Sequence, residues 1–329
     1  MMGAAGMLSS GPFAGSSAAG AGGAGAPPMD PATGGFNDFS VCSVERWRVE
    51  GLALHLVVDE SLAMVFPSDL WTPLGQALDA FVVSEQSSDL SVGAQFFQGD
   101  CDPASHAEPE LPIMPAGEQQ LLGGVMGERA HRPGAATGLA LNGALDNARA
   151  WATSQQQRAA LVLISGSVPS SCVASGEGVT TAVAAASSGL AQSPAVPTYV
   201  LSLRASAGLE SVAHAGGTGT AVVATDPAAQ DSVLQALHQL AERATCEYAL
   251  PQSAAPYLPD QVNLQHTLNG QTTVFPRVDG APSCSPLQGG FYYDDPQSPA
   301  RIIACQQSCD RVKQGGEVEI ILGCPSVKL

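Results

Sequence analysis

The sequence predicts an α/β fold, a doubly wound and mostly parallel sheet with helices on both faces, followed by a small β-rich extension that contains cysteines. Short apolar runs alternate along the chain with longer segments whose apolar residues recur at helical spacing. The runs are nearly continuous, as in strands that are buried on both faces of a parallel sheet. The composition changes from Cys246 onward, where five of the eight cysteines lie among many prolines.

The first half of the α/β region predicts two strands and three helices. Residues 52–58 are an apolar run of strand length, and 68–83 place Leu74, Leu78 and Phe81 on one helical face. A proline-rich loop with Cys101 precedes the second of these helices. The expected elements are, in order, a strand at 52–58, a helix at 68–83, a strand at 90–97, a short helix at 118–126 and a helix at 137–153.

The second half continues the alternation and then changes to short strands. The expected elements are a strand at 160–164, a helix at 178–190, strands at 196–203 and 220–224, and a helix at 230–243. In the extension, strands are expected near 261–266, 272–276, 301–304 and 317–322. Residues 292–296 (YYDDP) are interpreted as a turn, because aspartate and proline interrupt strands.

We expect three parts along the chain. Residues 1–46 are rich in glycine, alanine, serine and proline and predict a disordered linker. Residues 47–245 form the α/β domain. Residues 246–329 form the cysteine-rich β extension, which we expect to pack on that domain because so short a segment has little core of its own.

The charge of the chain excludes some classes of partner. The formal net charge is −17, and no lysine or arginine lies between Arg48 and Arg129, where thirteen acids occur. Nucleic acid binding usually needs a basic face, so we expect no nucleic acid partner, and an anionic membrane surface is disfavoured for the same reason. No run of about 18 apolar residues is present, so no transmembrane segment is expected.

The eight cysteines indicate disulfides and an oxidising compartment. No Cys-x-x-Cys pair occurs, and Cys305 and Cys309 lack a second pair at zinc spacing. Eight reduced thiols remain the alternative. We therefore expect an extracytoplasmic protein (periplasmic, surface or secreted), although residues 1–30 lack the basic and apolar regions of an export signal.

Polar side chains collect where the predicted strands end. Asp59 and Ser61 follow the first strand in the stretch HLVVDESLAM, Thr137 opens a long helix, and Ser165 follows the central strand. In a doubly wound sheet, ligands bind outside the carboxyl ends of the strands, so these side chains are expected to share one edge.

Together these residues resemble the von Willebrand factor type A domain, from about Leu52 to Arg243. That family carries an Asp-x-Ser-x-Ser loop, a threonine and an aspartate that form a metal-ion-dependent adhesion site, usually for magnesium. Asp59, Ser61 and Thr137 match three of the five positions, whereas Ala63 and Ser165 replace two ligands. The loss of a carboxylate and a hydroxyl weakens a site for a hard cation. The resemblance therefore implies a degenerate site with no cofactor, or at most weak Mg²⁺ or Mn²⁺ binding.

The alternative roles for these side chains are structural. Ser61 and Thr137 would act as helix N-caps, and Asp59 would accept hydrogen bonds from amides of its own loop. Asp69 is a further carboxylate that could substitute for the lost ligand, whereas side-chain direction argues against Glu60.

The whole chain also resembles a group of bacterial, cysteine-containing type A domain proteins with a low-complexity linker. Asp100-Cys101-Asp102, Cys172 and the tail GGFYYDDP at 289–296 carry this resemblance. Members usually have an export or lipoprotein signal, which implies a lipoprotein-like, extracytoplasmic protein. Because Cys101 and Cys172 lie in loops near the same rim, we expect them to form a disulfide. A second pairing, Cys309 with Cys324, is also considered.

The sequence favours a non-enzymatic protein-binding or adhesion-type module that binds an unknown protein partner without metal. The alternative within binding is adhesion that depends on a divalent cation. A hydrolase is the second alternative, since Ser165 and Ser167 follow a central strand. However, neither serine lies in the Gly-x-Ser-x-Gly pattern of a nucleophile elbow.

Overall fold

The α/β part contains a six-stranded sheet whose strand order places the first strand in the centre. A computed structural model describes residues 45–49, 51–119, 122–127, 129–170, 172, 176–250 and 258–328. The strand order is β4-β3-β2-β5-β6-β7, and all neighbours are parallel except β4, which is antiparallel to β3. The strands are β2 (Leu52–Asp59), β3 (Leu90–Phe97), β4 (Leu111–Pro115), β5 (Arg158–Ser165), β6 (Thr198–Ser202) and β7 (Val222–Val223).

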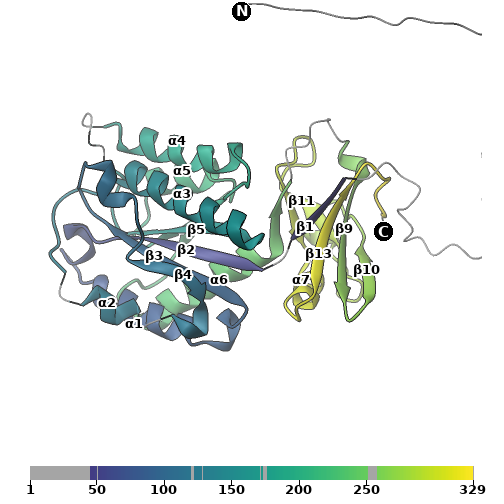
Figure 1. Ribbon diagram of the computed structural model, residues 1–329, viewed down its shortest axis with the longest axis horizontal. Coiled ribbons are helices and arrows are strands. Elements are labelled where there is room, and N and C mark those ends of the chain that lie inside the picture. The colour runs from purple at the N-terminus through teal and green to yellow at the C-terminus, as the bar shows by residue number, and fades with distance from the viewer. Residues whose placement is uncertain are drawn as a thin grey trace, which may run out of the picture. The chain divides into compact units, whose positions relative to one another are not determined.

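Helices cover both faces of this sheet (Figure 1). One face is covered by α1 (Trp71–Val82), α2 (Leu122–Met126) and α6 (Gln230–Cys246), and the other by α3 (Thr137–Gln155), α4 (Gly178–Ala191) and α5 (Ala207–Ala215). Successive side chains of β2 enter the two cores in turn: Leu54 and Leu56 join the α1 and α6 side, and Ala53 and Val57 the α3 side. The predicted doubly wound α/β class is therefore confirmed.

Two elements of the α/β part differ from the sequence expectation. The proline-rich loop contains an edge strand, β4, which pairs antiparallel with β3. An edge strand tolerates Pro112 and Pro115 because the backbone groups on its outer side form no hydrogen bonds to another strand, so the N–H that proline lacks is not needed there. Helix α5 was not predicted either, and it begins after Ser206, whose side chain accepts a hydrogen bond from the Leu209 amide.

The described residues of the C-terminal part form two small antiparallel sheets and a short α-helix, with 3-10 turns at 259–261 and 281–283. Its elements are β8 (Glu247–Ala249), β9 (Val262–Leu268), β10 (Gln271–Phe275), β11 (Phe291–Tyr293), β12 (Arg301–Ala304), α7 (Gln306–Val312) and β13 (Glu317–Leu322). The sheet orders are β1-β13-β9-β10, where β1 is Glu45–Val49, and β11-β12-β8. Tyr248, Leu264, Phe275 and Phe291 belong to one core cluster, so this part has a core of its own. The predicted turn at 292–296 is corrected, because its first two residues belong to β11.

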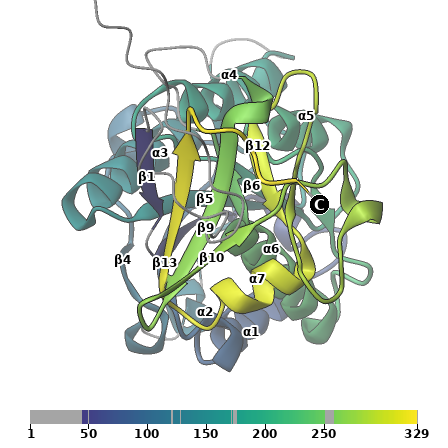
Figure 2. The ribbon, with the colours of Figure 1, turned by 90° about the vertical axis from the view of Figure 1, so that its right-hand side faces the viewer.

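Strand β1 (Glu45–Val49) belongs to the C-terminal sheet, where it pairs antiparallel with β13 (Figure 2). The α/β part is therefore inserted between β1 and the other strands of that sheet. Glu45 and Arg46 lie in this strand and not in the expected linker, whose residues 1–44 are outside the described residues. The described chain lies within the compact unit Phe39–Leu329, and the predicted division into 47–245 and 246–329 remains a prediction.

Disulfides join segments far apart in the sequence. Cys246 at the end of α6 is bonded to Cys309 in α7, and Cys284 to Cys305. The considered pairing of Cys309 with Cys324 is therefore wrong, since Cys309 faces the end of α6. Cys324 is also disulfide-bonded.

Candidate functional site

The candidate site lies at the carboxyl edge of the six-stranded sheet. Asp59 is the last residue of β2, and Ser165 is the last residue of its neighbour β5. Parallel neighbours end at the same edge, so the two side chains meet there although 106 positions separate them in the chain. Both are buried.

The Asp59 carboxylate is fully engaged in hydrogen bonds. One oxygen, Oδ1, accepts from the Ser61 backbone amide at 2.8 Å. The other, Oδ2, accepts from the hydroxyls of Ser165 and Ser167, each at 2.6 Å. The Ser167 amide in turn donates to Ser165 Oγ at 3.1 Å. Three donors thus stabilise a buried negative charge that would otherwise be costly.

Ser61 and Thr137 lie at the same edge but do not bind Asp59 through their side chains. Ser61 Oγ is buried and has no hydrogen-bond partner among the described residues. Thr137 Oγ1 donates to the Ala135 carbonyl at 3.2 Å. Neither acts as the N-cap considered above, because α3 has Ala136 at that position and Ser61 makes no capping bond.

These residues do not fit a magnesium centre. Magnesium prefers octahedral oxygen coordination and is usually bound through one or two carboxylates. Here Asp59 is the one carboxylate in the network, and both of its oxygens already accept hydrogen bonds. Ala63 contributes only its backbone carbonyl. Within the described residues, no group of three or more His, Cys, Asp or Glu side chains is arranged to hold a metal ion.

The two carboxylates considered as substitutes are used elsewhere. Glu60 pairs with the Arg129 guanidinium, which also contacts Glu110 at 3.3 Å. Asp69 accepts hydrogen bonds from the backbone amides of Trp71 and Thr72, at the start of α1. Neither carboxylate is directed at Asp59 or Ser165 by any of these contacts.

A disulfide lies on the rim of the site. Cys101, in the loop after β3, is bonded to Cys172, in the loop after β5, with a Cα–Cα distance of 5.4 Å. These are the two cysteines that the sequence led us to pair. The bond crosses β2 in the strand order and so connects the loops on either side of Asp59.

Arg204 holds two of the site loops together, and the sequence did not identify it. Its Nη1 donates to the Ala63 carbonyl at 2.7 Å and approaches the Gly166 carbonyl at 3.5 Å. Its Nη2 donates to Ser68 Oγ at 2.9 Å. A basic residue directly after a predicted strand, in a chain with only 13 lysines and arginines, was the available signal.

Exposed apolar side chains surround the buried network. Leu62 and Phe66 lie in the loop after β2 and are 41% and 68% exposed, and Val168 in the loop after β5 is 62% exposed. These three side chains place exposed apolar surface on two loops that Arg204 connects. The edge thus has a buried polar network and an apolar rim.

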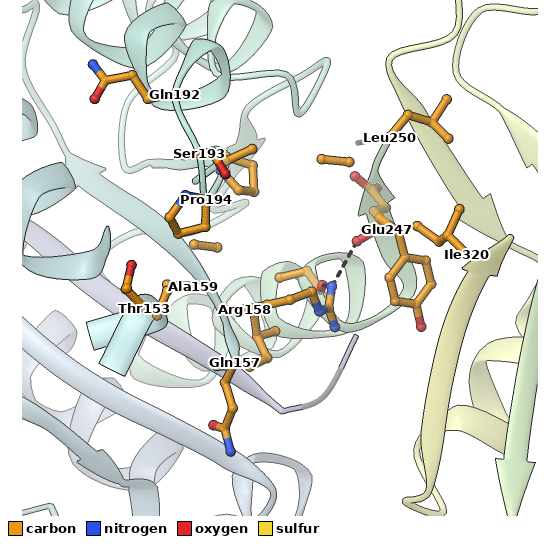
Figure 3. A pocket seen from close by; sticks show the side chains of 18 of the residues that line it. Thr153, Gln157, Arg158, Ala159, Gln192, Ser193, Pro194, Glu247, Leu250 and Ile320 are labelled. Carbon is orange, nitrogen blue, oxygen red and sulfur yellow. Dashed lines mark hydrogen bonds between the residues drawn. The ribbon is translucent and has the colours of Figure 1, made fainter. Parts of the chain in front are cut away.

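A pocket lies at the opposite edge of the sheet, between the starts of β2 and β5 and the C-terminal part (Figure 3). Its volume is about 460 Å³, and Leu250 and Ile320 line it together with Pro194. Two charged residues line it. Arg158 donates to the Ala244 and Glu247 carbonyls, each at 3.1 Å, at the end of α6, and the Glu247 carboxylate pairs with Arg243 and Arg301. Because both charged groups already have partners, the pocket offers little specific chemistry.

Comparisons with known proteins give structural similarities only. No protein-family model matches the chain, and no curated protein matches it. A von Willebrand factor type A protein from Catenulispora acidiphila is 11% identical, with a TM-score of 0.43 over 88% of this chain and 63% of that one.

Two further solved structures are similar at the same level. Proximal thread matrix protein 1 from the mussel byssus is 11% identical, with a TM-score of 0.42 over 63% of this chain and 51% of that one. The pilus adhesin SpaC from Lactobacillus rhamnosus GG is 14% identical, with a TM-score of 0.41 over 83% and 38%. The chain thus spans about half or less of these two structures. Similarities this weak do not identify a function.

Proposed function

We propose that this chain is a non-enzymatic protein-binding module of the adhesion type, and that it binds its partner through the edge around Asp59 without a metal ion. One observation carries the proposal: the Asp59 carboxylate is satisfied by Ser61, Ser165 and Ser167, while the rim of the same edge is apolar and exposed. An edge whose carboxylate is already hydrogen-bonded within the chain and whose rim is apolar suits contact with another protein surface.

Adhesion that depends on a divalent cation is the second candidate, and one observation favours it. Ser61 Oγ is buried without a hydrogen-bond partner among the described residues. Thr137 has only a 3.2 Å hydrogen bond to a carbonyl. A cation would use these two hydroxyls as ligands. The Asp59 carboxylate would first have to lose the hydrogen bonds that it accepts from the hydroxyls of Ser165 and Ser167.

Isothermal titration of the full chain with MgCl₂ and MnCl₂ separates the two candidates. We expect no submillimolar binding of either cation, because one occupied carboxylate is a poor ligand set for a hard ion. Submillimolar binding that is lost in Asp59→Ala and retained in Asp69→Ala would refute the metal-free proposal. Asp69 is the matched control, because it is a carboxylate of the same loop that caps α1.

The proposal that the chain is not an enzyme is supported by the surroundings of the two serines. Ser165 and Ser167 both donate to Asp59, and within the described part of the chain no histidine hydrogen-bonds to either. A serine nucleophile needs an adjacent base to remove its proton. We expect a fluorophosphonate probe to leave both serines unlabelled. Labelling of either serine that is lost in its alanine variant would favour the hydrolase.

We also propose that the protein works outside the cytoplasm, for which the disulfides are the support. Bonds such as Cys101–Cys172 and Cys284–Cys305 persist in oxidising compartments. No described helix has both the length and the apolar character needed to cross a membrane. Thiol titration of the denatured, unreduced native protein is expected to find no free thiol; one or more free thiols per chain would contradict this.

A further inference from the structure

Arg204 presents a fixed positive charge at the apolar rim. Its two terminal nitrogens are held by the Ala63 carbonyl and the Ser68 hydroxyl, on the loop after β2, and Nη1 also approaches the Gly166 carbonyl, on the loop after β5. These acceptors fix the orientation of the guanidinium but carry no net charge. The side chain remains partly exposed, and no carboxylate pairs with it among the described residues.

Acids of the neighbouring loops form no ion pair with Arg204 among the described residues, and Asp226, which follows β7, accepts from the Ala228 amide. Asp59 is buried beneath the loops, and its oxygens are shared by three donors. Asp69 follows Ser68 in the chain but turns its carboxylate to the amides at the start of α1. Asp100 follows β3, which is three strand positions from β6, or about 14 Å at the usual strand spacing.

A second arginine belongs to the same edge. The Arg132 carbonyl accepts from the Leu62 amide at 2.8 Å, and the Arg132 amide donates to Gln98. Its side chain is exposed, and no carboxylate pairs with it in the described chain. By contrast, Arg129 is neutralised by Glu60 and Glu110. A chain of formal net charge −17 thus keeps unneutralised cations on its apolar rim.

We propose that this edge binds a protein segment that carries a carboxylate beside an apolar side chain, and that Arg204 receives that carboxylate. This inference rests on the proposed function. A guanidinium has five N–H donors, and the Ala63, Gly166 and Ser68 acceptors use three of them. The Nε–H and one N–H of Nη2 are left for charge-assisted hydrogen bonds to a carboxylate. The exposed Phe66 and Val168, on the two loops that Arg204 bridges, supply the apolar contact. The negative charge of the partner is thus complementary to the positive charge of Arg204 at this edge, although the net charge of the whole chain is also negative.

The number of cations limits the class of partner. Two arginines suit one or two carboxylates, whereas a nucleic acid or an anionic membrane is held by a larger basic surface. The remaining charge of the chain is strongly negative, which repels a polyanion beyond the immediate edge. A short acidic and apolar peptide segment is therefore the occupant that fits.

The test uses the full chain and a displayed library of random twelve-residue peptides. Peptides recovered on the wild-type protein are synthesised with a fluorescent label, each in its acidic form and with its aspartate or glutamate changed to the amide. Their dissociation constants are then measured by fluorescence anisotropy. Arg204→Met removes the charge, and Arg204→Lys keeps the charge but loses the fork. Arg311→Met is the matched control, since Arg311 also donates to a carbonyl, that of Leu287 in the C-terminal part.

We expect recovered peptides to carry an acid next to an apolar residue. The amide form should bind the wild type about tenfold more weakly, as for the loss of one charge-assisted pair. Arg204→Met should cause a similar loss, with no further loss for the amide form. Arg204→Lys should give an intermediate loss, and Arg311→Met none. The comparison of the two peptide forms on the wild type stands even if a variant fails to fold.

Two negative results have different meanings. Peptides that lose binding in Phe66→Asp but tolerate both the amide form and Arg204→Met would overturn this inference and leave the proposed function intact. Peptides that bind equally to wild type and Phe66→Asp, or recovery of none, would overturn both. Retention on anionic phosphatidylserine vesicles that is lost in Arg204→Met, without any acidic peptide, would also overturn the inference in favour of a membrane.

Discussion

His55 lies in the middle of β2 and predicts how the stability of the protein depends on pH. The side chain is completely buried, and neither ring nitrogen has a hydrogen-bond partner among the described residues. Its neighbours in the sheet are Gly93 in β3 and Leu161 in β5. With no partner for a charged imidazolium, burial lowers the pKa of His55 from 6.5 to about 4.

The sign of the effect follows from the two protonation states. The unfolded chain binds a proton at His55 near pH 6.5, whereas the folded chain resists protonation until about pH 4. Below pH 6.5 the unfolded state therefore binds more protons, and stability is lost as the pH falls. The full loss is about 3 kcal/mol once the pH lies below both pKa values, and about 2 kcal/mol of it falls between pH 7 and pH 5.

The variant His55→Leu is expected to remove this part of the pH dependence. Leucine has nearly the same volume and leaves no buried ring nitrogen unpartnered, so its stability at pH 7 should equal or exceed that of the wild type. Urea unfolding at pH 7 and pH 5 measures the difference for both proteins. His238, whose pKa burial also lowers, is present in both and cancels in the comparison. Equal losses in wild type and variant between these pH values would refute the reasoning.

Two further predictions concern the connections described above. The double variant Cys101→Ser, Cys172→Ser releases a crosslink between positions separated by 71 in the sequence and should lower the unfolding free energy by about 2–4 kcal/mol. A loss under about 1 kcal/mol in urea titration would count against this. Arg158→Met removes the hydrogen bonds to the α6 carbonyls and the contact over the Tyr248 ring at 4.7 Å, so a loss of about 2–3 kcal/mol is expected. An unchanged thermal midpoint would contradict it.

Several strands of this fold could be predicted from the sequence because each is a short, largely apolar segment between turn residues. The strands at 90–97, 301–304 and 317–322 occur at the predicted bounds. Local periodicity fails for β4, whose prolines indicate a loop, and for β1, whose pairing partner β13 lies at the other end of the chain. Such pairings depend on distant residues that a window of the sequence does not contain.

The sequence predicts that the candidate site residues share one edge of the sheet, but it does not predict the hydrogen bonds between them. Strand ends follow from the apolar pattern, so Asp59 and Ser165 could be assigned to one edge. Side-chain direction in the loops beyond a strand has no period, and Ser167 and Arg204 were therefore missed as partners of this edge. The position of Ser165 at the end of a strand could be predicted from the sequence, but the hydrogen bond from its hydroxyl to Asp59 could not.

The pairing of β1 with β13 has a consequence for the order of folding during synthesis. Val49 pairs with Val318, so the C-terminal sheet cannot be completed until nearly the whole described chain has been made. The α/β part uses only residues between these strands and can fold while translation continues. Until β13 has been made, β1 lacks its partner strand in this sheet. The C-terminal sheet is therefore completed late in synthesis. This step is slow because it joins residues that are far apart in the sequence.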